Sequence, residues 1–329
     1  MTEGLKGHIH QIAKGIFKIG PLPTSYSVQT SPMLVLGDNQ VAIVEPGEQG
    51  QAPLLLEAIK ELGYGLDQVV YVMPTHIHFH HCQGVPTLMK QLPKAKVVLH
   101  PRAVPHVVDP TRLVESTLAV WGDKCYGPFE AISENRLIAA EDGQVFKVGG
   151  RELEVIHTPG HAPHHTSILD RQTKAMFPGD LGPGGGGTRI KRGRPEILPP
   201  VFFMDEQLAS LHKVRALKPV VFFSFNAGEN YEPDRMMAWL EEDILAIYNI
   251  CLEGMKKKIS YDALSDQVEA YYKKVGVGPP GEETQTRGNK PMAPFGMLAY
   301  IKRKFPELEL PEGAGGRMRQ AADQRTSHR

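Results

Sequence analysis

The sequence predicts an α/β fold in which two β-sheets pack face to face, with helices on their outer sides and a helical extension after them. Short apolar runs bounded by Gly, Pro, Asn and Asp are typical of strands, and they fall into two groups along the chain. Stretches with apolar residues at helical spacing accompany each group. From Pro233 onward the helical spacing continues without such strand-like runs, which indicates a helical extension.

The first group of strands begins a sheet near the N-terminus. Its strand-like runs are residues 16–19, 33–36, 41–44, 69–72 and 97–99. Leu55, Ile59 and Leu62 recur at helical spacing between these runs. Gly63 follows where a helix often ends in a residue with positive φ. A shorter helical stretch at 85–92 comes after a run of histidines, which we expect at the carboxyl edge of the sheet, where functional groups gather in α/β folds.

The second group repeats this pattern. Its strand-like runs are residues 153–156, 167–169, 174–177 and 220–223, and a helix is expected over 205–217. Three helical faces follow: Met236, Leu240, Ile244, Ile247 and Cys251; Leu264, Val268, Tyr271 and Val275; Phe295, Leu298, Ile301 and Phe305. These apolar faces must be covered by something, so we expect the extension to help roof the active site or to form a homodimer contact.

The same patterns divide the chain into three parts. We expect an α/β domain over residues 1–232, a helical extension over 233–310 and a flexible tail over 311–329. The tail is rich in Gly, Arg, Gln and Ser, and with almost no apolar residues it cannot repay its ordering entropy.

Composition restricts the class of partner. Lys and Arg total 37 and Asp and Glu also total 37, so the formal net charge is zero. This balance does not favour nucleic acid or an anionic membrane, and a small molecule is the better default. No run approaches the roughly 20 apolar residues of a membrane span, and the N-terminus lacks a signal-peptide core. We therefore expect a cytoplasmic protein in which Cys82, Cys125 and Cys251 are free thiols.

The densest chemical signal is a run of histidines. Four of the 14 histidines, His76, His78, His80 and His81, lie within residues 75–82. In an extended segment residues i and i+2 share a side, so His76 and His78 can converge on one metal, while a turn would redirect the other two. Packing so many polar rings together needs a partner, and a metal ion is the economical one. The spacing predicts two neighbouring metal sites.

Residues 75–84, T-H-I-H-F-H-H-C-Q-G, resemble the T-H-x-H-x-D-H-x-G-G signature of the metallo-β-lactamase superfamily, which includes glyoxalase II-like hydrolases. Residues 44–47 (V-E-P-G) resemble its I-D-T-G turn, residues 157–161 its H-T-P-G-H segment and residues 177–180 its F-x-G-D segment. Residues 100–110 are similar to a segment in a subgroup with helical C-terminal extensions. The resemblance implies an αββα four-layer sandwich.

The resemblance also implies roles for single residues. His76, His78 and His161 match the ligands of a first metal, His81 matches a ligand of the second, and Asp180 matches the carboxylate that bridges both. Such sites bind zinc or iron, and a metal-bound hydroxide then attacks an ester, thioester or lactone. Asp180 and His80 are the candidate catalytic residues, and Glu45, His165 and Asn226 are expected to contact the ligands.

Two departures from the family pattern concern the second metal. His80 stands where the family has an aspartate, and Asn226 stands where it has a histidine. An imidazole at position 80 can bind zinc or iron, or it can rotate away and leave one well-made site; for Asn226 hydrogen bonding is favoured over ligation. We therefore expect one tightly bound metal and a second that is weak or partly occupied.

Three functions remain open at this point. The first is a metal-dependent hydrolase of an ester, thioester or lactone. The second is a mononuclear iron oxidoreductase, and the third is a metal-binding protein without catalysis. A basic run, Arg189, Lys191, Arg192 and Arg194, is either a solvated loop or a holder for an anionic small-molecule substrate. The glycines at 182–187 lack the Gly-Lys-Ser/Thr ending of a phosphate-binding loop.

Overall fold

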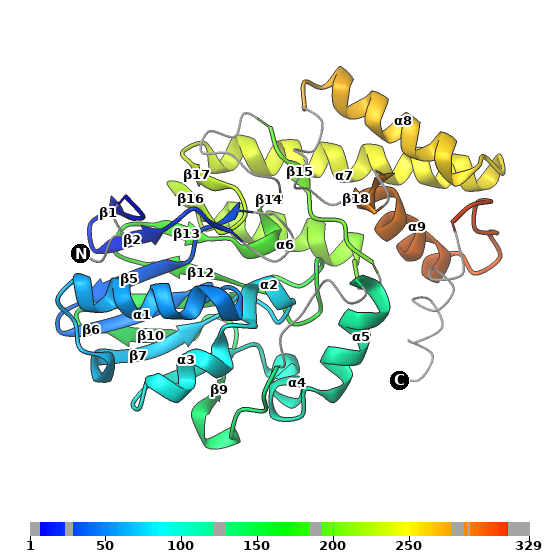
Figure 1. Cartoon of the computed structure of the whole chain (residues 1–329). Helices are drawn as coiled ribbons and strands as arrows, with labels where there is room; N and C mark the ends of the chain where they lie inside the picture. The colour runs from blue at the N-terminus through cyan, green and yellow to red at the C-terminus, as the bar shows by residue number, and fades with distance from the viewer. Residues whose placement is uncertain are drawn as a thin grey trace.

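The protein is described by a computed structural model that covers residues 7–23, 29–121, 129–184, 192–199, 201–277, 286–287 and 290–314 (Figure 1). Two β-sheets pack face to face in it, and helices cover their outer sides. The αββα arrangement is therefore confirmed. Cys125 and residues 315–329 of the expected tail lie outside the described residues. Within the described ranges, no helix has the length and apolarity needed to cross a membrane.

The first sheet has seven strands in the order β1-β2-β5-β6-β7-β8-β9. The pairs from β1 to β6 are antiparallel, and those from β6 to β9 are parallel. Its strands are β1 (Ile9–Ala13), β2 (Ile16–Ile19), β5 (Met33–Gly37), β6 (Gln40–Val44), β7 (Val69–Met73), β8 (Lys96–Leu99) and β9 (Leu137–Ala139).

The second sheet has six strands in the order β10-β11-β12-β13-β16-β17, in which only the β13–β16 pair is parallel. They are β10 (Val145–Val148), β11 (Arg151–His157), β12 (Thr166–Asp170), β13 (Ala175–Phe177), β16 (Val221–Ser224) and β17 (Gly228–Asn230). Among the described residues, three further sheets have two strands each: β3 (Leu22–Pro23) with β4 (Gln29–Thr30), β14 (Pro183–Gly184) with β15 (Arg194–Pro195), and β18 (Thr286–Arg287) with β19 (Lys290–Pro291).

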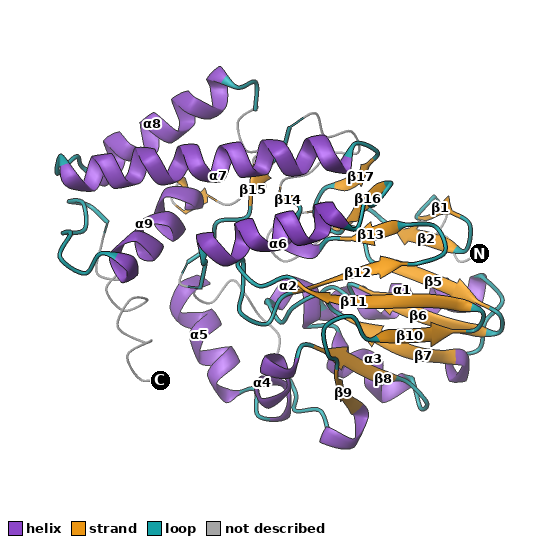
Figure 2. Ribbon diagram, turned by 180° about the vertical axis from the view of Figure 1, so that it is seen from behind, coloured by secondary structure: helices purple, strands orange, loops and turns teal. Residues whose placement is uncertain are grey.

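The helices lie on both sides of the paired sheets. They are α1 (Ala52–Glu61), α2 (Phe79–Cys82), α3 (Val85–Gln91), α4 (Val104–Val108), α5 (Thr111–Trp121), α6 (Met204–Ala216), α7 (Pro233–Lys256), α8 (Tyr261–Lys274) and α9 (Met292–Lys304). Helices α1 and α3 lie in front of the strands in Figure 1, whereas α6 and α7 lie in front in the reverse view of Figure 2. The helices therefore cover opposite faces of the sandwich.

Successive side chains of the central strands point to opposite faces of the first sheet and so belong to two different hydrophobic cores. Leu34 and Ile43 point to the helix side of the first sheet and pack with α1 and α3, whereas their neighbours Val35 and Ala42 point between the sheets. All four are fully buried, as a strand period of two requires when both faces are covered. A third core joins the outer face of the second sheet to α6, α7, α8 and α9.

Most predicted elements are found within one or two residues of their expected bounds, and Gly63 has the positive φ of 85° expected after α1. Lys174 and Val220, however, were wrongly placed in strands. Lys174 has a φ of 58° in the turn before β13, and Val220 is 56% exposed before β16. An apolar pattern does not show where a turn ends, so it predicts the ends of strands less accurately than their centres.

The predicted apolar face of α8 is found: Leu264 and Val268 are fully buried, and Tyr271 and Val275 pack partly buried against the same core. The spacing did not include Tyr272, which is the fully buried ring, and Tyr271 also donates its hydroxyl to Asp243 of α7 at 2.7 Å. Successive helical residues are only about 100° apart, so two adjacent tyrosines both lie near the buried face. The sequence alone does not choose between them.

Candidate metal centre

The histidine run lies at the carboxyl end of strand β7. His78 has an extended backbone with φ −64° and ψ 145°, and helix α2 begins directly after it. The rings of His76 and His78 come together at a centroid distance of 4.5 Å. Helix α2 turns His80 and His81 toward a different part of the site. The convergence of the first two histidines and the turn after them both follow the sequence prediction.

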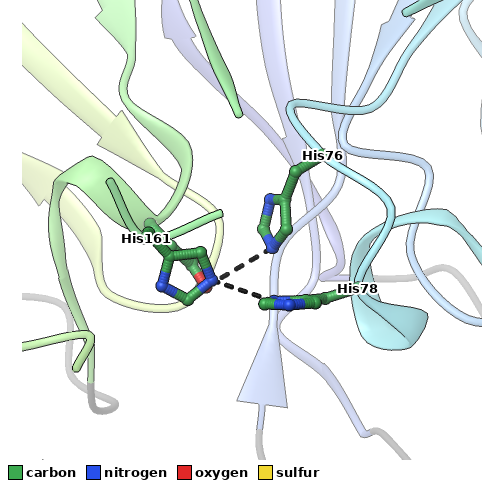
Figure 3. Close-up of side chains that lie close together, drawn as sticks. His76, His78 and His161 are labelled. Atoms are coloured by element: carbon green, nitrogen blue, oxygen red, sulfur yellow. Dashed lines mark hydrogen bonds and ion pairs between the residues drawn. The ribbon is translucent and has the colours of Figure 1, made fainter. Parts of the chain in front are cut away.

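His76, His78, His161 and Asp180 form one group of metal-ligating side chains, with one ligand atom from each within 4.8 Å of every other. Nε2 of His161 lies 2.9 Å from Nδ1 of His78 and 3.2 Å from Oδ2 of Asp180. Figure 3 shows the three rings turned toward one another.

The polar atoms at the centre of this group support a bound cation. Nε2 of His76 lies 3.7 Å from Oδ2 of Asp180, and both atoms are buried without a hydrogen-bond partner among the described residues. Buried polar atoms are almost always satisfied. A metal held by three imidazoles and one carboxylate would satisfy both, and this donor set suits zinc or iron.

Asp180 also belongs to a second group, with His80 and His81. Its Oδ1 lies 3.2 Å from Nε2 of His81, while its Oδ2 faces His161, so each carboxylate oxygen faces one group. Burial acts to raise the pKa of Asp180, but His81 and His161 lower it well below its usual value. Burial lowers the pKa of His80 to about 3.

Glu45 holds the other ring nitrogen of His81. Its Oε2 lies 3.0 Å from Nδ1 of His81, and its carboxylate accepts hydrogen bonds from the amide and the hydroxyl of Thr75 at 3.2 and 2.7 Å. Burial acts to lower the pKa of His81. The nearby carboxylates of Glu45 and Asp180 outweigh this effect and raise the pKa to about 10. The backbone of Glu45 has a φ of 56°. A residue other than glycine that is kept in this costly backbone conformation is typical of a functional site.

His165 supports Asp180 without joining either group. Its Nδ1 lies 3.0 Å from the carbonyl of Thr158, and its Nε2 accepts a hydrogen bond from the backbone amide of Asp180 at 2.9 Å. These two bonds fix the ring and hold the turn that carries Asp180. Gly179 makes the close approach possible, because a Cβ there would lie 2.5 Å from Nε2 of His165.

Asn226 contacts the bridging carboxylate directly. Its Nδ2 donates to Oδ1 of Asp180 at 2.9 Å, which agrees with the hydrogen-bonding role favoured from the sequence. Among the other candidates, His157 donates Nε2 to the carbonyl of Ala140, and its ring contacts that of His100 at a centroid distance of 4.1 Å. Neither of these rings belongs to a ligand group found among the described residues.

Two further candidates also lie outside the ligand groups of the described residues. The ring of His164 is 6.4 Å from that of His76. Cys82 is buried, and burial raises the pKa of its thiol well above the usual value. Cys82 and Cys251 are both free thiols, as expected.

The described part of the basic run faces the C-terminal helices. Arg192 pairs with Asp243 of α7 at 2.6 Å, and Arg194 pairs with Glu269 of α8 at 2.5 Å. Arg189 and Lys191 lie outside the described residues. Arg192 and Arg194 are therefore engaged in packing helices, not in a solvated loop.

Glu196 is a site residue that the sequence did not reveal. Its backbone carbonyl accepts a hydrogen bond from Nδ1 of His161 at 2.9 Å, and its side chain is buried. Burial, and then Asp180, raise the pKa of its carboxyl well above the usual value. Nothing local marks this residue, because Glu196 follows a two-residue strand and reaches His161 across 35 positions.

Gly160 in the H-T-P-G-H segment gives a stability prediction. Its φ is 138°, and a Cβ there would lie 2.4 Å from the backbone of Gln207 in α6. Gly160→Ala combines backbone strain with a clash against a helix that cannot move freely, so we expect a loss of about 3 kcal/mol or more. Chemical denaturation of the purified variant measures this loss.

Gly63→Ala is the matched control for this prediction. Gly63 also has a positive φ, 85°, but nothing lies within 4 Å of the position of its Cβ. Only backbone strain remains, at a cost of roughly 1–2 kcal/mol. Equal losses in the two variants would contradict the claim that the contact between α6 and the Gly160 turn is tight.

Residues 26–224 match the family model of the metallo-beta-lactamase superfamily, which is more than half of the chain. The chain belongs to this superfamily. It is 26% identical over 214 residues to the metallo-beta-lactamase fold-containing protein ST1585 of Sulfurisphaera tokodaii, with 63% of this chain and 76% of that protein covered. It is also 26% identical over 186 residues to the atrochrysone carboxyl ACP thioesterase nsrC of Aspergillus novofumigatus. That match covers 56% of this chain and 48% of the thioesterase, about half its length.

One solved structure resembles this superfamily member over a larger part of the chain than the family model does. The metallo-beta-lactamase family protein TTHA1429 of Thermus thermophilus superposes with a TM-score of 0.64 at 18% identity, covering 89% of this chain and 95% of that one. At this identity the likeness concerns the fold alone. The superposition therefore includes residues beyond 26–224, the range that the family model matches.

Proposed function

We propose that this protein is a metal-dependent hydrolase that cleaves a small-molecule ester or thioester. The observation that carries the proposal is the pair of ligand groups that share Asp180, each carboxylate oxygen facing one group. Thioesters come first among the substrates because fungal relatives at 23–26% identity are named as acyl carrier protein thioesterases. A lactone is the next alternative, since it presents the same carbonyl chemistry.

Two groups of side chains would hold the metal ions. His76, His78, His161 and Asp180 would bind the first metal, and His80 and His81 with Asp180 would bind a second. A bound divalent metal lowers the pKa of water to about 7 and polarises a carbonyl oxygen. Zinc and iron both suit these donors, and we propose zinc for the hydrolytic form.

Hydrogen bonds from neighbouring residues would orient the ligands. Glu45 fixes His81, His165 fixes the backbone of Asp180, and Asn226 fixes its side chain. Ligand partners of this kind set ring orientation and ligand basicity. Glu45, His165 and Asn226 would thus orient the ligands without binding the metal themselves. Asp180 is the ligand common to both groups.

Chelation and reconstitution test the proposal. Protein purified without added metal should hydrolyse at least one member of a panel of acyl-coenzyme A thioesters, nitrophenyl esters and lactones. Treatment with a chelator should abolish the activity, and Zn²⁺ should restore it. Equal rates before and after chelation, or no turnover of any member by fully loaded protein, would exclude the function.

The same material separates the iron alternative. If iron, not zinc, restores hydrolysis, the hydrolase proposal stands and its metal is iron. An iron signal in electron paramagnetic resonance from protein that hydrolyses no member of the panel would instead favour the oxidoreductase alternative and contradict the hydrolase proposal.

A further inference from the structure

We propose that the C-terminal helices α7, α8 and α9 position the metal ligand His161, through the segment of residues 192–198. This inference rests on metal binding by His161 and not on the proposed hydrolysis. It therefore holds for any substrate, and its test is metal affinity.

The connection begins at the metal centre. Nδ1 of His161 donates to the carbonyl of Glu196 at 2.9 Å, and both residues are buried. A metal-ligating histidine commonly donates its second ring N–H to a carbonyl or carboxylate, and that bond sets the orientation of the ring. The position of the Glu196 backbone therefore decides where Nε2 of His161 points.

Helix α8 anchors the residue two positions before Glu196. Arg194 donates to both carboxylate oxygens of Glu269, at 2.5 and 2.9 Å. Its guanidinium also lies 4.1 Å from the ring centroid of Tyr272, which is fully buried. A two-point ion pair together with a stacked ring fixes both the position and the plane of the guanidinium. Strand β15 is thereby tied to α8.

Helix α7 anchors the same segment two residues earlier. Arg192 donates to Asp243 at 2.6 and 3.3 Å, and the carboxylate of Asp243 is fully buried. Tyr271 of α8 donates to the same carboxylate. Arg192 also lies 5.7 Å from the ring centroid of Trp239. A buried carboxylate needs its cationic partner, so these contacts hold α7, α8 and the segment together.

Helix α9 contacts the segment on the other side of Glu196. A Cβ on Gly296 would lie 2.5 Å from the carbonyl oxygen of Ile197 and 3.0 Å from the carbonyl carbon of Leu198. The helix backbone therefore rests directly on the backbone of the segment. Three helices thus restrain residues 192–198 on both sides of the carbonyl that orients His161.

The test removes one anchor from the full-length protein without leaving a lone charge. Arg194→Gln combined with Glu269→Gln should weaken binding of the first Zn²⁺ by about tenfold, the lower end of the effect of losing a direct partner of a metal ligand, because the Glu196 carbonyl remains but is less firmly held. Competition with a chromophoric chelator measures this affinity. The absorption bands of the Co²⁺-loaded variant should also shift, because the geometry at His161 changes.

A buried ion pair elsewhere in the chain provides the matched control. Arg151 pairs with Asp170 at the start of β11, at the end of that strand opposite the metal ligands, and both are almost fully buried. Arg151→Gln with Asp170→Asn should lower the free energy of unfolding but leave Zn²⁺ affinity and the Co²⁺ spectrum unchanged. A control that weakens Zn²⁺ binding as much as the test variant would show that general loosening is the cause, and would overturn the proposal.

A conservative variant keeps the proposal falsifiable if the double variant does not fold. Arg194→Lys retains the charge but loses the two-point pair and the planar stack over Tyr272. It should fold and bind Zn²⁺ severalfold more weakly than the natural protein. Natural affinity in a folded Arg194→Lys or Arg194→Gln/Glu269→Gln variant would refute positioning through this segment.

Discussion

Replacing His76 and His78 together by alanine is expected to abolish tight metal retention. The two residues supply two of the three imidazoles in the first ligand group, and the remaining His161 and Asp180 cannot complete a four-ligand site. Elemental analysis of protein purified without added metal should fall from about one tightly bound ion per chain to near zero. The loss should be nearly complete because each ligand helps to position the ion for the others.

The control for this loss is a second pair of histidines beside the site. The rings of His100 and His157 are in contact, with their centroids 4.1 Å apart, and lie outside the ligand groups of the described residues. Replacing both by alanine removes the same number of imidazoles, yet the metal content should not change. An unchanged metal content in the His76→Ala/His78→Ala variant, or an equal loss in the control, would refute the assignment of the first site.

The second large effect concerns the second ligand group, which we expect to bind metal more weakly than the first. Two divalent ions carry a charge of +4, and of the two carboxylates usual in this family at these positions only Asp180 is present, since position 80 is a histidine. Asn226 adds to the imbalance, because its Nδ2 donates to Oδ1 of Asp180, the oxygen that faces the second group.

Restoring the family pattern should reverse this imbalance. His80→Asp with Asn226→His replaces one imidazole by a carboxylate and one amide by an imidazole, so the site gains a negative charge and keeps its number of imidazoles. Affinity for the second Zn²⁺ should therefore rise by about tenfold to a hundredfold. Calorimetric titration of the apoprotein with Zn²⁺ resolves the two binding steps. The first step, at His76, His78 and His161, should change little.

A single substitution decides whether His80 is itself a ligand. If its imidazole binds the second ion, His80→Ala should weaken the second step and leave the first unchanged. Two equally tight steps in the natural protein would contradict the predicted imbalance. That result would mean that His80 is a full ligand in a histidine-rich dimetal centre.

The family motifs were recognisable in the sequence because metal ligation and tight turns need particular residue types at short spacing. His76, His78 and His81 follow a strand end, and the predicted turn at His78 is present. Strands were recognised for the same local reason: apolar runs bounded by turn residues persist whatever the tertiary context. Where a strand ended at a turn, as at Lys174 and Val220, the pattern was not sufficient.

What the sequence by itself determined is thus the set of ligand types and the order of the elements that carry them. The sequence predicted that Glu45 and Asn226 contact the ligands, but only the tertiary structure decided which ligand each one contacts: Glu45 lies beside His81, and Asn226 beside Asp180. The carbonyl of Glu196 beside His161 was not predicted at all. These partners are 35 to 46 positions apart in the chain, and Arg194 and Glu269 are 75 apart. A polar side chain gives the same local signal whether it faces water or a distant partner, so such contacts depend on where the folded strands and helices come to lie.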